Sequence, residues 1–378
     1  MILRYILPTF IYFGYMHSLW MILAYIPLHL EALGFSQFQI SFLISLLSFF
    51  PLLVVIPLGI FSDRISPKKL VILGLLLLAL FAFLIQFFDS FKGFLFLFVI
   101  GGIGNSIFVV SCSSLYYKLL QGGSRGMKIG FFAALGNLGY GVGPLVGSLL
   151  LQGVKLQDLF MVIFCLTLPF IGLSFFLLDV KPEPLSLGTY RKDLSRFEVL
   201  ILIGITFLVA THFGAERTTL SLFLKFNAGV AEDQMGVIFF CVGIMLAAVI
   251  FTLGFFSDIH ANLKMLLLLG LLFSGAFNIG MITVHSFYSA LTIRLLHVIG
   301  DSAYLIAQRI AISHLFKPHR IGGNIGVLDT ITTFGTFVGA LMSGLVPGYA
   351  YPFVVTGALS FAGAFVLFFL KPDFSQQH

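Results

Sequence analysis

Long apolar runs alternate with short polar connections along almost the whole chain. Each run is close to the roughly 20 residues that a helix needs to cross the hydrocarbon core of a bilayer. Helices satisfy their backbone hydrogen bonds internally, as a membrane interior requires. We therefore predict an all-α membrane protein whose twelve spanning helices lie at residues 5–30, 40–62, 70–88, 93–117, 128–151, 157–178, 198–224, 234–257, 264–284, 287–313, 322–345 and 350–370.

The longest polar connection divides these spans into two sets of six. It contains Pro182 and Pro184, which interrupt helices, together with charges of both signs. We predict an amino-terminal six-helix bundle at 1–178, a cytoplasmic linker at 179–197 and a carboxy-terminal six-helix bundle at 198–378.

The two sets of spans carry matching landmarks. Small residues spaced nine, four and four apart in the fifth span recur 196 positions later in the eleventh. Gly104 matches Gly300 at the same offset, and His17 matches His212 at an offset of 195. Such a repeat is typical of secondary transporters, whose two halves enclose a central site.

Composition supports the membrane assignment. Hydrophobic residues make up 59% and charged residues 10% of the chain, and the mean hydropathy is +1.08, far from the range of soluble domains. The first span is too long for a cleaved signal peptide and carries His17 and Trp20 inside it. Cys112, Cys165 and Cys241 lie in three different spans, so they indicate packing and no metal site or disulfide.

Basic residues gather on alternate loops and so predict the orientation. The richer loops, together with Arg4 and Lys371, place both termini in the cytoplasm, and we expect a bacterial inner membrane. The net charge of +6 therefore reflects topology and gives no indication of nucleic-acid binding.

A short motif follows the second span and recurs after the eighth. The first copy reads Gly-Ile-Phe-Ser-Asp-Arg from Gly59, and the second reads Gly-Phe-Phe-Ser-Asp from Gly254, 195 positions later. The motif resembles the loop between helices 2 and 3 of the major facilitator superfamily of transporters. Ser66-Pro67 departs from the family's usual Gly-Arg and weakens the basic part. The resemblance implies a cytoplasmic gate, to which we assign Gly59, Asp63, Arg64, Lys68, Lys69, Gly254 and Asp258, with Asp329 as a supporting residue.

The small residues of the fifth span resemble the helix-5 signature of antiporter branches of this superfamily, with Ser148 in place of the last glycine. In those proteins the signature forms a flexible contact between the two halves, whereas small-residue stripes also serve simple helix packing. The residues assigned to this helix-packing hinge are Gly130, Gly139, Gly143, Pro144, Gly147, Gly326, Gly335 and Gly339.

Helices 1, 4, 7 and 10 line the central cavity in this superfamily, so the resemblance makes polar residues on these spans candidates for substrate and proton binding. Ionisable side chains at membrane depth are costly and mark such pathways. Those of the tenth span are spaced three or four apart and share one face. The candidates are His17, Trp20, Asn105, His212, Glu216, Arg217, Arg294, His297, Asp301, Tyr304 and Gln308.

Glu216 and Arg294 lie at similar predicted depths on the seventh and tenth spans. We hypothesise that Glu216 pairs with Arg294 or with its neighbour Arg217 in at least one conformation. A carboxylate whose positive partner moves away can change its proton occupancy, which would couple proton binding to transport. A purely structural ion pair is the alternative. For Asp301, His17 and His212 the alternative is hydrogen bonding within the bundle.

The sequence therefore predicts a monomeric secondary transporter without cofactors, which binds a small molecule and protons in a lipid bilayer. Proton-coupled efflux of amphipathic or hydrophobic compounds is the first interpretation, resting on the helix-5 resemblance. Proton-coupled uptake of a small organic acid or nucleoside-like solute is the alternative, because Arg294 and His297 suit an anion. A polytopic membrane enzyme is a further alternative, although catalysis does not require two matching halves.

Overall fold

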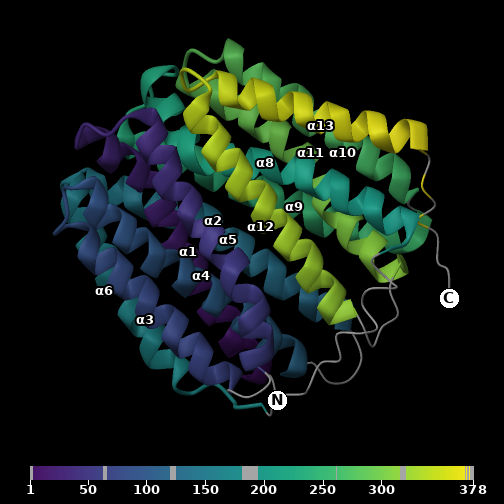
Figure 1. Cartoon of the computed structure of the whole chain (residues 1–378), viewed down its shortest axis with the longest axis horizontal. Coiled ribbons are helices and arrows are strands. Elements are labelled where there is room, and N and C mark those ends of the chain that lie inside the picture. The colour runs from purple at the N-terminus through teal and green to yellow at the C-terminus, as the bar shows by residue number, and fades with distance from the viewer. Residues whose placement is uncertain are drawn as a thin grey trace. The chain divides into compact units, whose positions relative to one another are not determined.

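The computed structural model of the protein describes residues 3–62, 66–119, 125–180, 195–260, 262–315, 321–370, 372 and 374. Within these residues the chain is helical and contains no strand (Figure 1). The twelve predicted spans are confirmed as helices. They are α1 (Leu3–Ala32), α2 (Gln37–Ser62), α3 (Pro67–Ile85), α4 (Phe91–Leu119), α5 (Arg125–Leu151), α6 (Leu156–Ser174), α8 (Phe197–Phe226), α9 (Glu232–His260), α10 (Leu263–Gly280), α11 (Phe287–Leu315), α12 (Ile321–Leu345) and α13 (Tyr351–Leu370), with a 3-10 turn at Met281–Thr283.

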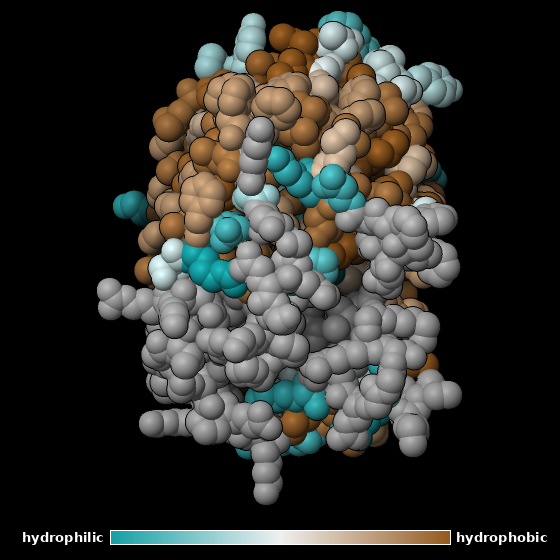
Figure 2. Space-filling model, turned by 90° about the vertical axis from the view of Figure 1, so that its right-hand side faces the viewer, coloured by the Kyte–Doolittle hydropathy of each residue, from teal (hydrophilic) through white to brown (hydrophobic). Residues whose placement is uncertain are grey.

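Counting only the residues whose surroundings are described, ten of these helices are long and apolar enough to cross a membrane. Large hydrophobic side chains are exposed on many of them, as lipid-facing residues are: Phe251 is 73% and Phe365 is 63% exposed. Figure 2 shows hydrophobic residues covering most of the described upper part of one face. The surface therefore fits an apolar solvent rather than water.

The starts of α3 and α10 show the internal repeat at the level of single hydrogen bonds. Ser66 caps α3, where its hydroxyl accepts from the backbone N–H of Lys69, and Asn262 caps α10 by accepting from the N–H of Met265. The two caps lie 196 positions apart. Each satisfies a backbone donor that the first turn of a helix leaves without a partner.

The described contacts group the chain into two compact units. The first comprises Met1–Leu185 with Ala231–Gly243, and the second comprises Ser186–Val230 with Ile244–His378. In the first unit α1 packs against α5 and α6, and α3 packs against α4 and α6. In the second, α8 packs against α12 and α13, and α10 packs against α11 and α13. The two units thus repeat one set of helix pairings.

Glycines explain the closest of these pairings. A Cβ added at Gly143 would lie 2.1 Å from the carbonyl oxygen of His17, and one added at Gly339 would lie 1.8 Å from that of Thr211. No side chain larger than hydrogen fits such a gap, so α5 can approach α1, and α12 can approach α8, only at glycine. Gly139 and Gly147 also face α1, and Gly335 also faces α8.

Candidate functional site

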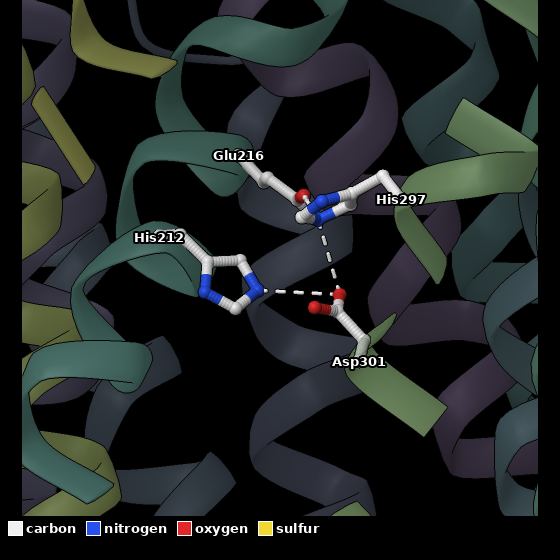
Figure 3. A group of neighbouring side chains, drawn as sticks. All are labelled: His212, Glu216, His297 and Asp301. Carbon is white, nitrogen blue, oxygen red and sulfur yellow. Dashed lines mark hydrogen bonds and ion pairs between the residues drawn. The ribbon is translucent and has the colours of Figure 1, made fainter. Parts of the chain in front are cut away.

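Five charged or titratable side chains meet between α8 and α11 in the second unit. His212 and Glu216 are four residues apart on α8, whereas Arg294, His297 and Asp301 follow one another at steps of three and four on α11. Helical periodicity turns each set toward one face. Figure 3 shows His212, Glu216, His297 and Asp301 pointing toward one another from the two helices. We call these five residues the charge cluster.

The contact between Glu216 and Arg294, one of the two pairings hypothesised from the sequence, is present. Nη1 of Arg294 donates to Oε1 of Glu216, and the two side chains are only 2% and 10% exposed. Few buried guanidinium groups occur without such an anion, because desolvating an unpaired charge costs several kcal/mol. The pair therefore holds Arg294 within the helix bundle.

His297 connects the two carboxylates of the cluster. Its Nε2 lies 3.1 Å from Oε1 of Glu216 and 3.1 Å from Oδ2 of Asp301, and its side chain is fully buried. The other ring nitrogen, Nδ1, lies 2.9 Å from the carbonyl oxygen of Ser274 on α10. Gly300 permits this last contact, because a Cβ there would lie 2.3 Å from the backbone nitrogen of Ser274 and would push α11 away from α10.

Asp301 and His212 complete the cluster on its other side. Nε2 of His212 lies 3.2 Å from Oδ2 of Asp301. Oδ1 of Asp301 and Nδ1 of His212 are buried and have no hydrogen-bond partner among the described residues. An unbonded polar atom in a buried site is costly unless water or a ligand reaches it, so these two atoms mark the places where the cluster can accept a small polar group.

The cluster has the dimensions of a metal-binding set, since one ligand atom from each of His212, Glu216, His297 and Asp301 lies within 4.8 Å of the others. However, each of these four side chains already bonds to another cluster member. Arg294 adds a permanent positive charge against Glu216, which opposes the entry of a divalent cation. We therefore interpret the cluster as a hydrogen-bonded network of ion pairs.

Tyr304 and Gln308, also predicted for the cavity, belong to a separate network one and two turns beyond Asp301. The hydroxyl of Tyr304 donates to Oγ1 of Thr206 at 3.0 Å, and Nε2 of Gln308 lies 2.8 Å from the same oxygen. Both side chains are buried. Their hydrogen bonds join α11 to α8, and among the described residues no hydrogen bond or ion pair connects their side chains to the charge cluster.

The predicted cavity residues of the first half lie on α1 and α4. Oδ1 of Asn105 accepts a hydrogen bond from the hydroxyl of Tyr15 at 3.1 Å. Trp20 is half-buried and packs edge-on against Tyr140, with ring centroids 4.5 Å apart. His17 is buried near the Phe13 ring. None of these contacts joins two of the predicted cavity residues to each other.

The predicted cytoplasmic gate is only partly described. Nζ of Lys68 donates to the carbonyl oxygen of Phe175 at 2.8 Å, and Lys69 and Asp329 are exposed. Asp63 and Arg64 lie outside the described residues, and the surroundings of Gly59, Gly254 and Asp258 are also outside the description. The same holds for Gly130 and Gly326 of the predicted hinge. The roles of all these residues remain predictions.

The sequence profile of the Major Facilitator Superfamily matches residues 9–214 and 202–377. The chain belongs to the Major Facilitator Superfamily. Family and fold point to a membrane transporter rather than an enzyme. The motif resemblance drawn from the sequence is thereby confirmed at the level of the family.

Relatives and solved structures agree with this membership. An MFS-type transporter of Methanocaldococcus jannaschii is 21% identical over 336 residues, which is 84% of each chain. The methyl viologen resistance protein SmvA of Salmonella typhimurium is 26% identical over 221 residues, 54% of this chain and 43% of that protein. The nucleoside transporter NupG superimposes with a TM-score of 0.79 at 14% identity, covering 98% of this chain and 100% of NupG. A bacterial homologue of the human lysosomal transporter Spinster gives 0.78 at 17% identity, covering 97% and 96%.

The sequence analysis did not identify two residues that contribute to the site. Ser274 acts through its backbone carbonyl, which carries no residue-type signal. Thr206 binds Tyr304 and Gln308 through its hydroxyl. A polar residue six positions before His212 on the same apolar span was the available signal for Thr206.

Proposed function

We propose that this chain is a proton-coupled secondary transporter that exports small amphipathic or hydrophobic compounds. The charge cluster of α8 and α11 is the observation that supports this proposal most directly. Ionisable groups buried at membrane depth are costly and are retained mainly where ions or substrates pass. Two carboxylates, two imidazoles and a guanidinium in one network exceed what a structural ion pair needs.

The proposed coupling rests on the exchange of partners at Glu216. Arg294 and His297 face this carboxylate from α11, and His212 precedes it by one turn on α8. If a conformational change withdraws Arg294, a proton can replace its charge on the buried carboxylate. Proton uptake and release then follow the opening of the site to the two sides of the membrane.

Alternating access supplies the movement in this proposal. The halves 1–178 and 198–378 move relative to each other about the linker 179–197, as in transporters built from internal repeats. We place the protein as a monomer in a bacterial inner membrane with both termini in the cytoplasm. The repeated helix pairings of the two units support this division.

The direction of transport is proposed from chemistry and from one relative. SmvA is named for resistance to methyl viologen, a flat aromatic dication, and it matches about half of this chain. Exported compounds of this kind suit a chain with half-buried aromatic rings such as Trp20. A permanent cation is also a clean probe, because it does not itself carry protons across a bilayer.

Everted membrane vesicles test this proposal. Respiration acidifies their interior, and a pH-sensitive dye reports the gradient. We expect methyl viologen to cause proton release from vesicles that contain the wild-type protein, and Glu216→Gln to abolish that release. Vesicles with equal protein levels of Glu198→Gln, a half-buried carboxylate at the start of the same helix, serve as the control. Release that persists in Glu216→Gln contradicts the coupling role.

Uptake by proton symport is the second candidate. It is supported by the cationic side chains of the charge cluster and by the fold likeness to a nucleoside transporter. Because Arg294 is already paired with Glu216, an anionic substrate would have to displace that carboxylate. Accumulation of labelled uridine or benzoate by whole cells, without any response to methyl viologen in vesicles, would favour this candidate.

A further inference from the structure

The contacts of the two ring nitrogens of His297 restrict where hydrogen atoms can lie in the charge cluster. The carbonyl oxygen of Ser274, 2.9 Å from Nδ1, can only accept a hydrogen bond. Nδ1 of His297 therefore carries a hydrogen atom. In a neutral imidazole the second nitrogen, Nε2, then presents a lone pair and no hydrogen.

That lone pair would face two acceptors. Nε2 of His297 lies 3.1 Å from a carboxylate oxygen of Glu216 and 3.1 Å from a carboxylate oxygen of Asp301. Ionised carboxylate oxygens are also acceptors only. In a buried site, Nε2 of His297 cannot lie 3.1 Å from each of these two oxygens as a bare acceptor, without a hydrogen atom between it and at least one of them. One additional proton must therefore lie in this gap.

The neighbouring contacts indicate which atom holds the proton. Oε1 of Glu216 already accepts from Nη1 of Arg294, and Oδ2 of Asp301 lies 3.2 Å from Nε2 of His212. Oxygens that receive donors from two sides are favoured as ionised carboxylates. A proton on Nε2 of His297 can be donated to Oε1 of Glu216 and places a positive charge 3.1 Å from Oδ2 of Asp301, whereas a proton on Oε1 of Glu216 would compete with Arg294.

We propose that His297 is the group that carries the exchangeable proton, held between Glu216 and Asp301, and that the described conformation is the proton-loaded one. This inference rests on the proposed function and refines it: while Glu216 is paired with Arg294, the exchangeable proton lies on Nε2 of His297 and not on the carboxylate. The positive charges of Arg294 and His297 then balance the negative charges of the two carboxylates.

Release of the proton breaks this balance. The cluster is left with one net negative charge, and the lone pair of Nε2 faces the oxygens of Glu216 and Asp301 at hydrogen-bond distance. Like charges and facing acceptors repel in a low-dielectric site. The contact between α8 and α11 is therefore weakened as the proton leaves, which links the occupancy of Nε2 to the packing of the second unit. Asp301 acts here as a positioning residue for the proton.

Nitrogen-15 NMR of histidine-labelled protein in lipid bilayers tests the proton's position without any substrate. The chain contains nine histidines, so the contribution of His297 is read from a difference spectrum between the wild type and His297→Gln near neutral pH. We expect a doubly protonated imidazole signal that disappears in His297→Gln and persists in His29→Gln, which removes a buried histidine of α1. A wild-type spectrum without such a signal, or one that survives His297→Gln, would overturn the proposal.

A transport measurement in proteoliposomes separates this inference from the proposed function. Methyl viologen is the probe, and movement driven by a pH gradient is compared with exchange of labelled for unlabelled probe. We expect the ratio of gradient-driven movement to exchange to fall about tenfold or more in His297→Gln. An unchanged ratio refutes the role of His297 while leaving proton coupling intact. If the wild type shows no gradient-driven movement, the proposed function fails, and the NMR result alone decides where the proton lies.

Discussion

Removing the charge of Glu216 should destabilise the protein far more than removing the charge of Arg294. The two side chains form the buried ion pair of the charge cluster. In Glu216→Gln the guanidinium stays charged, because arginine does not lose its proton in proteins. In Arg294→Gln the carboxylate keeps His297 as a partner at 3.1 Å, and it can also be neutralised by taking up a proton.

The expected loss in free energy of unfolding follows from the burial of the ion pair. Removing one partner of a buried ion pair costs about 3–5 kcal/mol, since the other charge is left uncompensated. The second unit contains about 180 residues, a size at which 1 kcal/mol shifts the melting temperature by roughly 2–4 °C. Glu216→Gln should therefore lower the melting temperature by roughly 6–20 °C, and Arg294→Gln by clearly less.

Thermal unfolding of the purified protein in detergent, followed by size-exclusion chromatography of the soluble fraction, measures this difference. The double variant Glu216→Gln/Arg294→Gln replaces the ion pair by two amides, and we expect it to melt closer to the wild type than Glu216→Gln does. Acidification should restore part of the stability lost in Arg294→Gln, because a proton then neutralises Glu216, and should restore none in Glu216→Gln.

Two results would refute this reasoning. One is a melting temperature of Glu216→Gln within a degree or two of that of the control Glu198→Gln. The other is a double variant whose loss equals the sum of the two single losses, since additivity means that the side chains do not interact.

Two further predictions concern packing and the aromatic part of the first unit. Gly339→Leu should prevent recovery of monodisperse protein, because its Cβ would lie 1.8 Å from the carbonyl oxygen of Thr211; Gly204→Leu, with nothing within 4 Å of an added Cβ, should purify normally. Trp20 is the single tryptophan of the chain, so its fluorescence reports on the contact with Tyr140, and we expect methyl viologen to quench it saturably through stacking with an aromatic dication. Quenching that rises linearly without saturation would indicate collisions and contradict a role of Trp20 in binding.

The sequence by itself determined the spans, the internal repeat and the polar faces of the spanning helices. These follow from local rules, because twenty apolar residues suffice for a crossing and steps of three or four place side chains on one face. The steps from Arg294 to His297 and Asp301, and from His212 to Glu216, were therefore readable without a structure. The similar depth of Glu216 and Arg294 in the membrane could also be predicted without a structure.

Only the tertiary structure decided which groups each of these faces meets. Periodicity fixes the direction of a side chain around its own helix but not the neighbouring helix or its axial offset. Hence the sequence could not assign His297 to two carboxylates at once, nor to the carbonyl of Ser274, since a backbone carbonyl is the same at every residue. The spacing of the glycines of α5 likewise predicted a close helix contact without naming the partner helix. The structure places Gly139, Gly143 and Gly147 against α1.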